Sequence, residues 1–245
     1  GGTDHNLDCE GRDRTSMQFP QGQTELIRQV SAINGKTIVV LMHGAPIDLP
    51  WIDRVPAVLD MFFPGMEGGT AMADILFGDA DPSGRLTFSW PERLEDSPVY
   101  ELATQDVDNV NYEDSLMVGY RYFDTKRVTP RYEFGYGLSY TKFDYRKLSV
   151  DQDAENVRLS FTIKNSGKYN GDEVAQVYVQ FPEIGVKVPI KQLKGFERVH
   201  IAKGKTLPVT ITVPKKELRI WNEKKGEFFT PLGNYVFMIG ASSDD

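Results

Sequence analysis

The apolar residues of this 245-residue chain change their spacing near Phe143, and this change limits the fold more than any other feature. Beyond it, apolar and polar residues alternate, as in Val157–Lys164 (VRLSFTIK), which is followed by the turn Asn165-Ser-Gly167. A period of two places successive side chains on opposite faces of a strand. About seven such short strands in a hundred residues favour a β-sandwich of the immunoglobulin-like kind.

The first ninety residues follow another pattern, in which helical and extended segments alternate. Leu26, Ile27, Val30 and Ile33 have helical spacing, and Asn34-Gly35 is a typical helix end. The short apolar run TIVVLM predicts a strand buried on both faces of a parallel sheet. The predicted segments are a helix over 23–33, strands over 37–42 and 57–63, a helix over 69–77 and an extended segment over 85–89.

These patterns predict an α/β plus all-β chain of three parts. Residues 1–92 form part of an α/β layered sandwich domain, residues 93–142 an ordered linker whose aromatic side chains need burial, and residues 143–245 a fibronectin type III-like (immunoglobulin-like) β-sandwich. The first domain lacks the strand that should precede the loop around Glu10. We therefore expect the chain to be the later part of a longer protein.

Composition excludes several classes of protein. The net charge of −7 and the pI of about 5.1 disfavour a nucleic-acid partner, which needs basic surface to displace counterions. No apolar run approaches the roughly 18 residues that span a bilayer, so we expect no membrane segment. The single cysteine, Cys9, forms no disulfide within the chain. We expect a soluble protein, secreted, periplasmic or cytoplasmic, whose ligand is a neutral small molecule or glycan, and a homo-oligomer stays open.

Five stretches of the sequence occur together in one known family. The segment Asp8-Cys-Glu-Gly-Arg-Asp-Arg14 closely resembles the Glu-Gly-x-Asp-Arg loop of glycoside hydrolase family 3. The last domain resembles the fibronectin type III-like module of the same family. The other stretches that resemble it, in the same order, are Phe63–Gly78 (FPGMEGGTAMADILFG), Pro82–Pro91 (PSGRLTFSWP), and Val118–Phe123 with Phe134–Tyr140.

The resemblance implies that Glu10 is the general acid/base and that Asp13 and Arg14 support its loop. It implies a retaining double displacement, in which an Asp nucleophile on a (β/α)8 barrel attacks while Glu10 protonates the departing oxygen, the two carboxyls about 5 Å apart. No residue here matches the nucleophile motif. We therefore expect the partner to be an N-terminal barrel-containing chain or segment, the substrate to be β-linked glucosides or oligosaccharides, and this chain alone to be inactive. No cofactor is implied.

The charges beside Glu10 need an explanation. Arg12 and Arg14 flank it, and a nearby cation favours the ionised form of a carboxyl, whereas a general acid must hold its proton. Our hypothesis is that Arg14 pairs with Asp13 or with another buried carboxylate and holds the loop.

Other residues are weaker candidates for the site. Asp8 and His5 lie in the same loop, and Cys9 has no histidine nearby in the sequence to activate it. The three histidines show no metal-ligand spacing, and Asp79–Gly84 lacks the full ligand pattern of a calcium loop. We expect no metal site, a turn over 79–84, and packing roles for Trp51, Trp90 and Trp221.

Several activities stay open. Within the family, Arg93–Pro98 favours the β-glucosidase branch, which releases terminal non-reducing β-D-glucosyl residues. β-Xylosidase or arabinosidase activity is the alternative, and a phosphorylase would share the fold. Outside enzymes, the alternative is a non-catalytic carbohydrate-binding module, which would have no use for an intact Glu10 loop.

Overall fold

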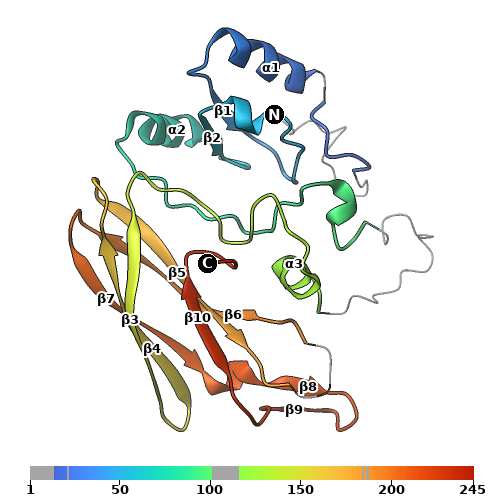
Figure 1. Cartoon of the computed structure of the whole chain (residues 1–245), viewed down its shortest axis with the longest axis vertical. Coiled ribbons are helices and arrows are strands. Elements are labelled where there is room, and N and C mark those ends of the chain that lie inside the picture. The colour runs from blue at the N-terminus through green and yellow to red at the C-terminus, as the bar shows by residue number, and fades with distance from the viewer. Residues whose placement is uncertain (1–13, 21, 101–115, 184, 186–187) are drawn as a thin grey trace. The chain divides into compact units, whose positions relative to one another are not determined.

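The computed structural model describes residues 14–20, 22–100, 116–183, 185 and 188–245 (Figure 1). The described residues fall into two compact units. The first unit holds residues 14–80 and 91–100, and the second holds residues 81–90 and 116–245. The domain limits at 92 and 142 stay a prediction. None of the helices in the described ranges is long and apolar enough to cross a membrane.

The first unit contains the predicted α/β pattern, and its sheet is parallel as expected. Strands β1 and β2 pair in register from Ile38 with Ala57 to Leu41 with Asp60. Both carboxyl ends therefore meet at one edge of the sheet. The elements of this unit are α1 (Gln23–Ile33), β1 (Ile38–Leu41), the 3-10 turn η1 (Ile52–Arg54), β2 (Ala57–Asp60), α2 (Gly68–Phe77) and the 3-10 turn η2 (Leu94–Asp96).

Helix α2 ends where the sequence predicts. Gly78 follows it with a φ of 84°, a left-handed conformation that glycine adopts without strain, and its backbone N–H bonds to carbonyls of the last turn.

Burial of β1 is one-sided in the described residues. Val39 and Leu41 are buried, but 47% of Ile38 is exposed, so the expected burial on both faces is not observed. Helix α1 has no buried residue, and its apolar positions Leu26 and Ile33 are 62% and 89% exposed. The apolar face predicted for this helix is therefore largely exposed in the described part of the chain.

The second unit contains the predicted β-sandwich, made of two antiparallel three-stranded sheets and a hairpin. One sheet has the order β3-β4-β7 and the other the order β10-β5-β6, while among the described strands β8 pairs only with β9. The strands are β3 (Phe143–Gln152), β4 (Asn156–Asn165), β5 (Gly171–Gln180), β6 (Gln192–Ile201), β7 (Thr206–Pro214), β8 (Ile220–Asn222), β9 (Glu227–Phe229) and β10 (Val236–Gly240), with the 3-10 turn η4 (Lys215–Leu218) after β7.

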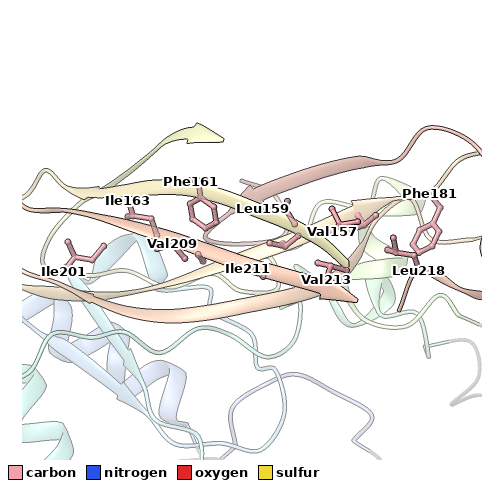
Figure 2. Close-up of a cluster of buried hydrophobic side chains, with 13 residues drawn as sticks. Val157, Leu159, Phe161, Ile163, Phe181, Ile201, Val209, Ile211, Val213 and Leu218 are labelled. Atoms are coloured by element: carbon pink, nitrogen blue, oxygen red, sulfur yellow. The ribbon is translucent and has the colours of Figure 1, made fainter. Parts of the chain in front are cut away.

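The sandwich core follows from the alternation seen in the sequence. Every second residue of β4, from Val157 to Ile163, is buried, and the same holds for β7 from Val209 to Val213. They pack against apolar residues of the other sheet, including Ile201 of β6 (Figure 2). Burying such side chains contributes about 1.5–3 kcal/mol each relative to full exposure.

Strand β5 is buried on both faces, which explains the aromatic residues before the sandwich. Tyr178 faces away from the core and packs edge-to-face on Tyr120, with ring centroids 5.7 Å apart. Tyr120 in turn lies 4.9 Å from the ring of Phe134, and its hydroxyl accepts a 2.7 Å hydrogen bond from Leu193 N. Tyr120 belongs to a short helix, α3 (Tyr120–Lys126), that the sequence pattern did not predict. The expected burial of linker aromatics is confirmed at Tyr120 and Phe123.

The extended segment predicted over 85–89 is not a strand of the parallel sheet. It lies in the second unit, where Leu86 N donates to Tyr136 O at 2.9 Å and Trp90 N to Tyr132 O at 2.7 Å. Trp90 and Tyr132 form an isolated antiparallel bridge. The partner of this segment is therefore a loop about 45 residues later in the sequence rather than β1 or β2.

Candidate functional site

The predicted site falls partly outside the described residues. Glu10 and Asp13 lie outside them, as do the competing residues His5, Asp8 and Cys9. Arg14 is described, and so is the segment that continues from it to residue 20. The structure therefore describes segment 14–20, which follows Glu10 in the sequence, but not Glu10 itself.

Two contacts attach segment 14–20 to the chain that follows β1. Met17 is buried, and its carbonyl oxygen accepts a 2.8 Å hydrogen bond from Asp48 N. Phe19 stacks on Trp51, with ring centroids 6.5 Å apart and planes inclined by 18°. Trp51 is 2% exposed. The expectation that Trp51 has a packing role is confirmed, and the residue it packs against is in the segment next to the predicted acid/base.

Arg14 bonds within its own segment and acts electrostatically on one carboxyl of the loop after β1. Its Nη2 donates to Gln18 O at 3.3 Å, within its own segment. Its guanidinium is also close enough to Asp48 to act on that carboxyl: burial raises the pKa of Asp48, the Arg14 guanidinium lowers it, and Glu95 raises it. Asp48 is only partly buried, and the pairing of Arg14 with Asp13 or with another buried carboxylate stays a prediction.

A buried histidine lies at the carboxyl edge of the sheet formed by β1 and β2. His43 follows β1, is 0% exposed, and its Nδ1 lies 2.8 Å from Ala45 O. Because a carbonyl oxygen only accepts, this nitrogen carries the hydrogen. Nε2 lies 3.1 Å from Asp60 Oδ1, at the carboxyl end of β2. The same oxygen accepts a 3.2 Å hydrogen bond from Phe62 N, and the Phe62 ring lies 5.5 Å from the imidazole.

This cluster joins the loops that leave β1 and β2. Ligands of open parallel sheets bind at the carboxyl ends of the strands. Phe62 has a φ of 48°, which is unusual for a residue other than glycine and often marks functional loops. His43, Asp60 and Asp48 were not identified from the sequence as site residues. Asp60 lies inside the second apolar run, and the other two residues follow the first run.

The other residues that the sequence analysis considered for a metal, turn or packing role have structural contacts or lie outside the described residues. Among the described residues no group of three His, Cys, Asp or Glu side chains could hold a metal ion. Asp81 accepts hydrogen bonds from Ser139 Oγ at 2.9 Å and Tyr140 N at 2.8 Å, so it ties its segment to the loop before β3. Trp90 is buried as expected, but Trp221 is 51% exposed. The packing role predicted for Trp221 was wrong, because in the described part of the chain β8 pairs only with β9, and the ring is covered on the side where Phe228 lies 5.1 Å away.

A groove lies between α1 and β1, with an empty volume of about 430 Å³. Its lining includes Phe19, Leu26, Ile27 and Met42, and none of the lining residues is charged. It offers apolar surface and one amide, Gln23, but no acid or base. Its lining residues therefore include no group suited to proton transfer.

Sequence profiles of two domain families match the chain. The profile described as the Glycosyl hydrolase family 3 C-terminal domain matches residues 1–140, and that of the Fibronectin type III-like domain matches residues 173–243.

Relatives of known name match over the whole chain. Thermostable beta-glucosidase B of Acetivibrio thermocellus is 40% identical over 248 residues, which cover 100% of this chain and 33% of that protein. Beta-glucosidase BoGH3A of Bacteroides ovatus is 35% identical over 98% of this chain and 33% of its own length. The chain thus spans about a third of the length of these curated relatives.

Solved structures of similar sequence share the fold. The beta-glucosidase of Kluyveromyces marxianus in complex with glucose gives a TM-score of 0.92 at 36% identity, covering 97% of this chain and 28% of that one. DesR, a beta-glucosidase from Streptomyces venezuelae in complex with D-glucose, gives 0.91 at 35% identity, covering 97% and 31%.

Proposed function

The chain belongs to glycoside hydrolase family 3, as its C-terminal domain and fibronectin type III-like domain, and on that premise we propose that it supplies the general acid/base of a β-glucosidase. In this proposal Glu10 protonates the oxygen that leaves the terminal β-D-glucosyl residue and later activates water. The Asp nucleophile comes from a barrel on an N-terminal segment or chain.

One observation carries the proposal. The Glu10-Gly-Arg-Asp-Arg14 motif falls in the segment matched by the family profile, and the chain is 34–40% identical, nearly end to end, to several proteins named as β-glucosidases. These names favour glucosidase over the xylosidase and arabinosidase alternatives, which no similar protein above carries.

The chemistry assigned to Glu10 has two demands. Its carboxyl must come within about 5–5.5 Å of the nucleophile, as in retaining glycosidases, and it must be protonated when the substrate binds. Arg14 works against the second demand, because a cation favours the ionised carboxylate. The Arg14 charge also acts on the Asp48 carboxyl, whose pKa it lowers, so Asp48 supplies an opposing charge. This arrangement supports Arg14 as a loop-supporting residue, and Asp13 is proposed for the same role.

The exposed apolar surface of the first unit supports a partner segment. Parallel sheets are stable when both faces are covered, yet β1 and β2 form a two-stranded sheet in the described residues. The apolar positions of α1 are open as well, with Ile33 89% exposed. We therefore propose that an N-terminal barrel-containing segment or chain packs here and that the 245 residues alone do not turn over substrate.

The test is a leaving-group comparison in the enzyme that contains both this chain and its barrel. Glu10→Gln should lower kcat/KM for phenyl β-glucoside, a poor leaving group, by at least about 100-fold, because that reaction needs the proton. Hydrolysis of dinitrophenyl β-glucoside should fall far less. Glu67→Gln, an exposed carboxylate of the same unit, serves as the control and should leave both rates near wild type.

Equal losses on the two substrates would contradict a general-acid role for Glu10. Turnover by the isolated 245-residue chain would contradict the need for a barrel. A preference for aryl xylosides over aryl glucosides would contradict the proposed β-glucoside substrate but not the general acid/base role of Glu10.

A further inference from the structure

The turn between α1 and β1 carries a pair of residues suited to a chemical modification. We propose that Asn34-Gly35 is a site of spontaneous deamidation, at which the side-chain amide of Asn34 is lost as ammonia and a carboxylate takes its place. The sequence contains one other Asn-Gly pair, Asn170-Gly171, and we expect the fold to protect that one. This inference is independent of the proposed function, since it concerns a turn and not the acid/base step.

The reaction takes place within the chain and consumes only water. The backbone nitrogen of Gly35 attacks Cγ of Asn34, so a C–N bond forms, the bond from Cγ to Nδ2 breaks, and the proton lost by the Gly35 nitrogen leaves with Nδ2 as ammonia. Water then opens the resulting cyclic imide at one of its two carbonyls. Opening at Cγ gives an aspartate, and opening at the backbone carbonyl gives an isoaspartate. Intramolecular attack of this kind is fast when the reacting atoms are held close together.

The turn prepares the side-chain carbonyl of Asn34 for this attack. Its Oδ1 accepts a 3.0 Å hydrogen bond from Lys36 N, an Asx turn that folds the side chain back along the main chain. A backbone N–H on this oxygen also stabilises the negative charge that develops there while Cγ is tetrahedral. Asn34 and Gly35 are both exposed, so water and base reach them.

The attacking nitrogen of Gly35 is unhindered. Nothing lies within 4 Å of the place that a Cβ of this residue would take. Thr37 bonds to Asn34 O through its N at 3.2 Å and its Oγ1 at 2.6 Å, but no hydrogen bond from Gly35 N is found in the described part of the chain. Because glycine has no side chain, the main chain can also rotate here to close the ring.

Asn170-Gly171 is the same pair followed by a different backbone. Asn170 is exposed, and its Oδ1 accepts a 2.9 Å hydrogen bond from Lys203 N, so its carbonyl is activated in the same way. Gly171, however, is buried as the first residue of β5 and pairs with Ile201 of β6. Ring closure must rotate the main chain at this point, and the strand pairing opposes that rotation. The two pairs therefore differ in the freedom of the attacking nitrogen.

The product would change the end of helix α1. Asn34 directly follows this helix, and its backbone N–H bonds to Val30 O at 2.9 Å. A carboxylate here meets the negative end of the helix dipole, and the last turn of α1 has no basic residue to offset it. Isoaspartate also adds a methylene group to the main chain between α1 and β1, which both line the groove of about 430 Å³. We expect the last turn of α1 to open more easily after the reaction.

The experiment follows both pairs in the complete enzyme, incubated at mildly alkaline pH and sampled by mass spectrometry of its tryptic peptides. Asn34 should be converted at least about 10-fold faster than Asn170 in the folded enzyme, and the two rates should converge when the same protein is unfolded in urea. Enzymatic methylation of isoaspartate should label the Asn34 peptide. Equal rates in the folded enzyme, or a difference that persists in urea, would overturn the inference.

Gly35→Ala is the matched control, because a Cβ has room at this position and the φ of Gly35 is not left-handed. The added methyl group hinders the attacking nitrogen, so this variant should convert Asn34 several-fold more slowly. An unchanged rate would mean that the amide is hydrolysed directly and not through the neighbouring nitrogen. Hydrogen exchange measures the consequence: the last-turn amides of α1 should exchange faster after conversion, and unchanged exchange would overturn the effect on the helix.

Discussion

Arg85 and Glu173, 88 residues apart in the sequence, form a buried ion pair, with Nη2 of the arginine 2.7 Å from Oε2 of the glutamate. Their side chains are 9% and 2% exposed. The other carboxylate oxygen accepts a 2.8 Å hydrogen bond from the Tyr145 hydroxyl, and burial with the Glu173 charge raises the pKa of that tyrosine. The pair joins segment 81–90 to strand β5 inside the second unit.

Glu173→Gln should therefore lower the free energy of unfolding of the second unit by about 3–5 kcal/mol, because it leaves the Arg85 cation buried without its counter-charge. Tyr145→Phe should cost less, about 1–2 kcal/mol, since it removes one hydrogen bond to a charged acceptor. Urea unfolding followed by tryptophan fluorescence measures both. Asp144→Asn is the control: its ion pair with Arg146 is exposed, and a change above about 1 kcal/mol there would show that exposure does not set these costs.

Helices and strands of this fold were predictable where the spacing of apolar residues alone determines them. The spacing of Leu26 to Ile33 and the Asn34-Gly35 end predicted the limits of α1, and alternation predicted β4, β5, β7 and β10. Helix α3 was missed because its seven residues have no apolar period. It depends instead on partners distant in sequence, such as Leu193 N on the Tyr120 hydroxyl and Ile190 N on Thr125 Oγ1.

The contacts of segment 14–20 were less predictable, because they too join residues that are distant in the sequence. The motif around Glu10 named Arg14, but an aspartate such as Asp48 in a loop carries no signal in the sequence. Only the return of the chain after β1 brings its backbone N–H to the Met17 carbonyl. Likewise the packing role predicted for Trp221 failed because nothing in its surroundings in the sequence shows that β8 has a single neighbour among the described strands.

Asn165 should be one of the most sensitive positions of the sandwich. Its side chain is fully buried and uses all its hydrogen-bonding capacity: Oδ1 accepts from Thr141 Oγ1 at 2.6 Å and Gly167 N at 3.1 Å, and Nδ2 donates to Tyr169 O at 2.7 Å and Ile201 O at 2.8 Å. Asn165→Ala should cost about 2–4 kcal/mol, because it leaves several buried polar groups without partners.

The aspartate variant separates hydrogen bonding from size. Asn165→Asp places a carboxylate against the carbonyl oxygens of Tyr169 and Ile201, so it should be less stable at pH 7 than near pH 4, where protonation restores a donor. Urea midpoints at the two pH values measure this. Asn156→Ala, less buried on the same strand, should change stability by less than about 1 kcal/mol. Equal effects at 156 and 165 would refute the role of the buried network.

Asp124 should make the second unit more stable in mild acid. Burial raises the pKa of this carboxyl to about 6, and the Lys191 ammonium 3.4 Å away only partly opposes this. Because the folded-state pKa lies above the ordinary value near 4, the folded state binds the proton more tightly. Its stabilisation is complete below about pH 4 and is lost as the pH rises through 6.

Comparing wild type with Asp124→Asn isolates this effect. The free energy of unfolding of the wild type should rise by roughly 1–2 kcal/mol more than that of the variant between pH 7.5 and pH 5, after allowance for solvent screening. Asp151→Asn, exposed on β3, should follow the wild-type curve. Parallel curves for wild type and Asp124→Asn would mean that the carboxyl is ionised throughout this range.

We expect the second unit to need glycine at position 137 because no space is left for a side chain there, and not because of its backbone conformation. A Cβ at this position would meet the backbone oxygen of Gly84 closer than contact permits and Arg85 Nη1 at 2.8 Å. The first obstacle is backbone and the second is an arginine already committed to Glu173, so neither can yield cheaply. Gly137→Ala should lower the free energy of unfolding by about 1–3 kcal/mol or more, as other overpacking changes do, and urea unfolding measures the loss.

Gly84→Ala is the matched control for this crowding, since nothing lies within 4 Å of the place that its Cβ would take and its φ is not left-handed. Because alanine restricts the unfolded chain, that variant should be neutral or slightly stabilising, by up to about 1 kcal/mol. Combining Gly137→Ala with Glu173→Gln tests the mechanism: once Arg85 has lost its carboxylate it can move aside, so the combined loss should be smaller than the sum of the two single losses. Full additivity would leave the Gly84 carbonyl as the sole obstacle and separate Gly137 from the buried ion pair.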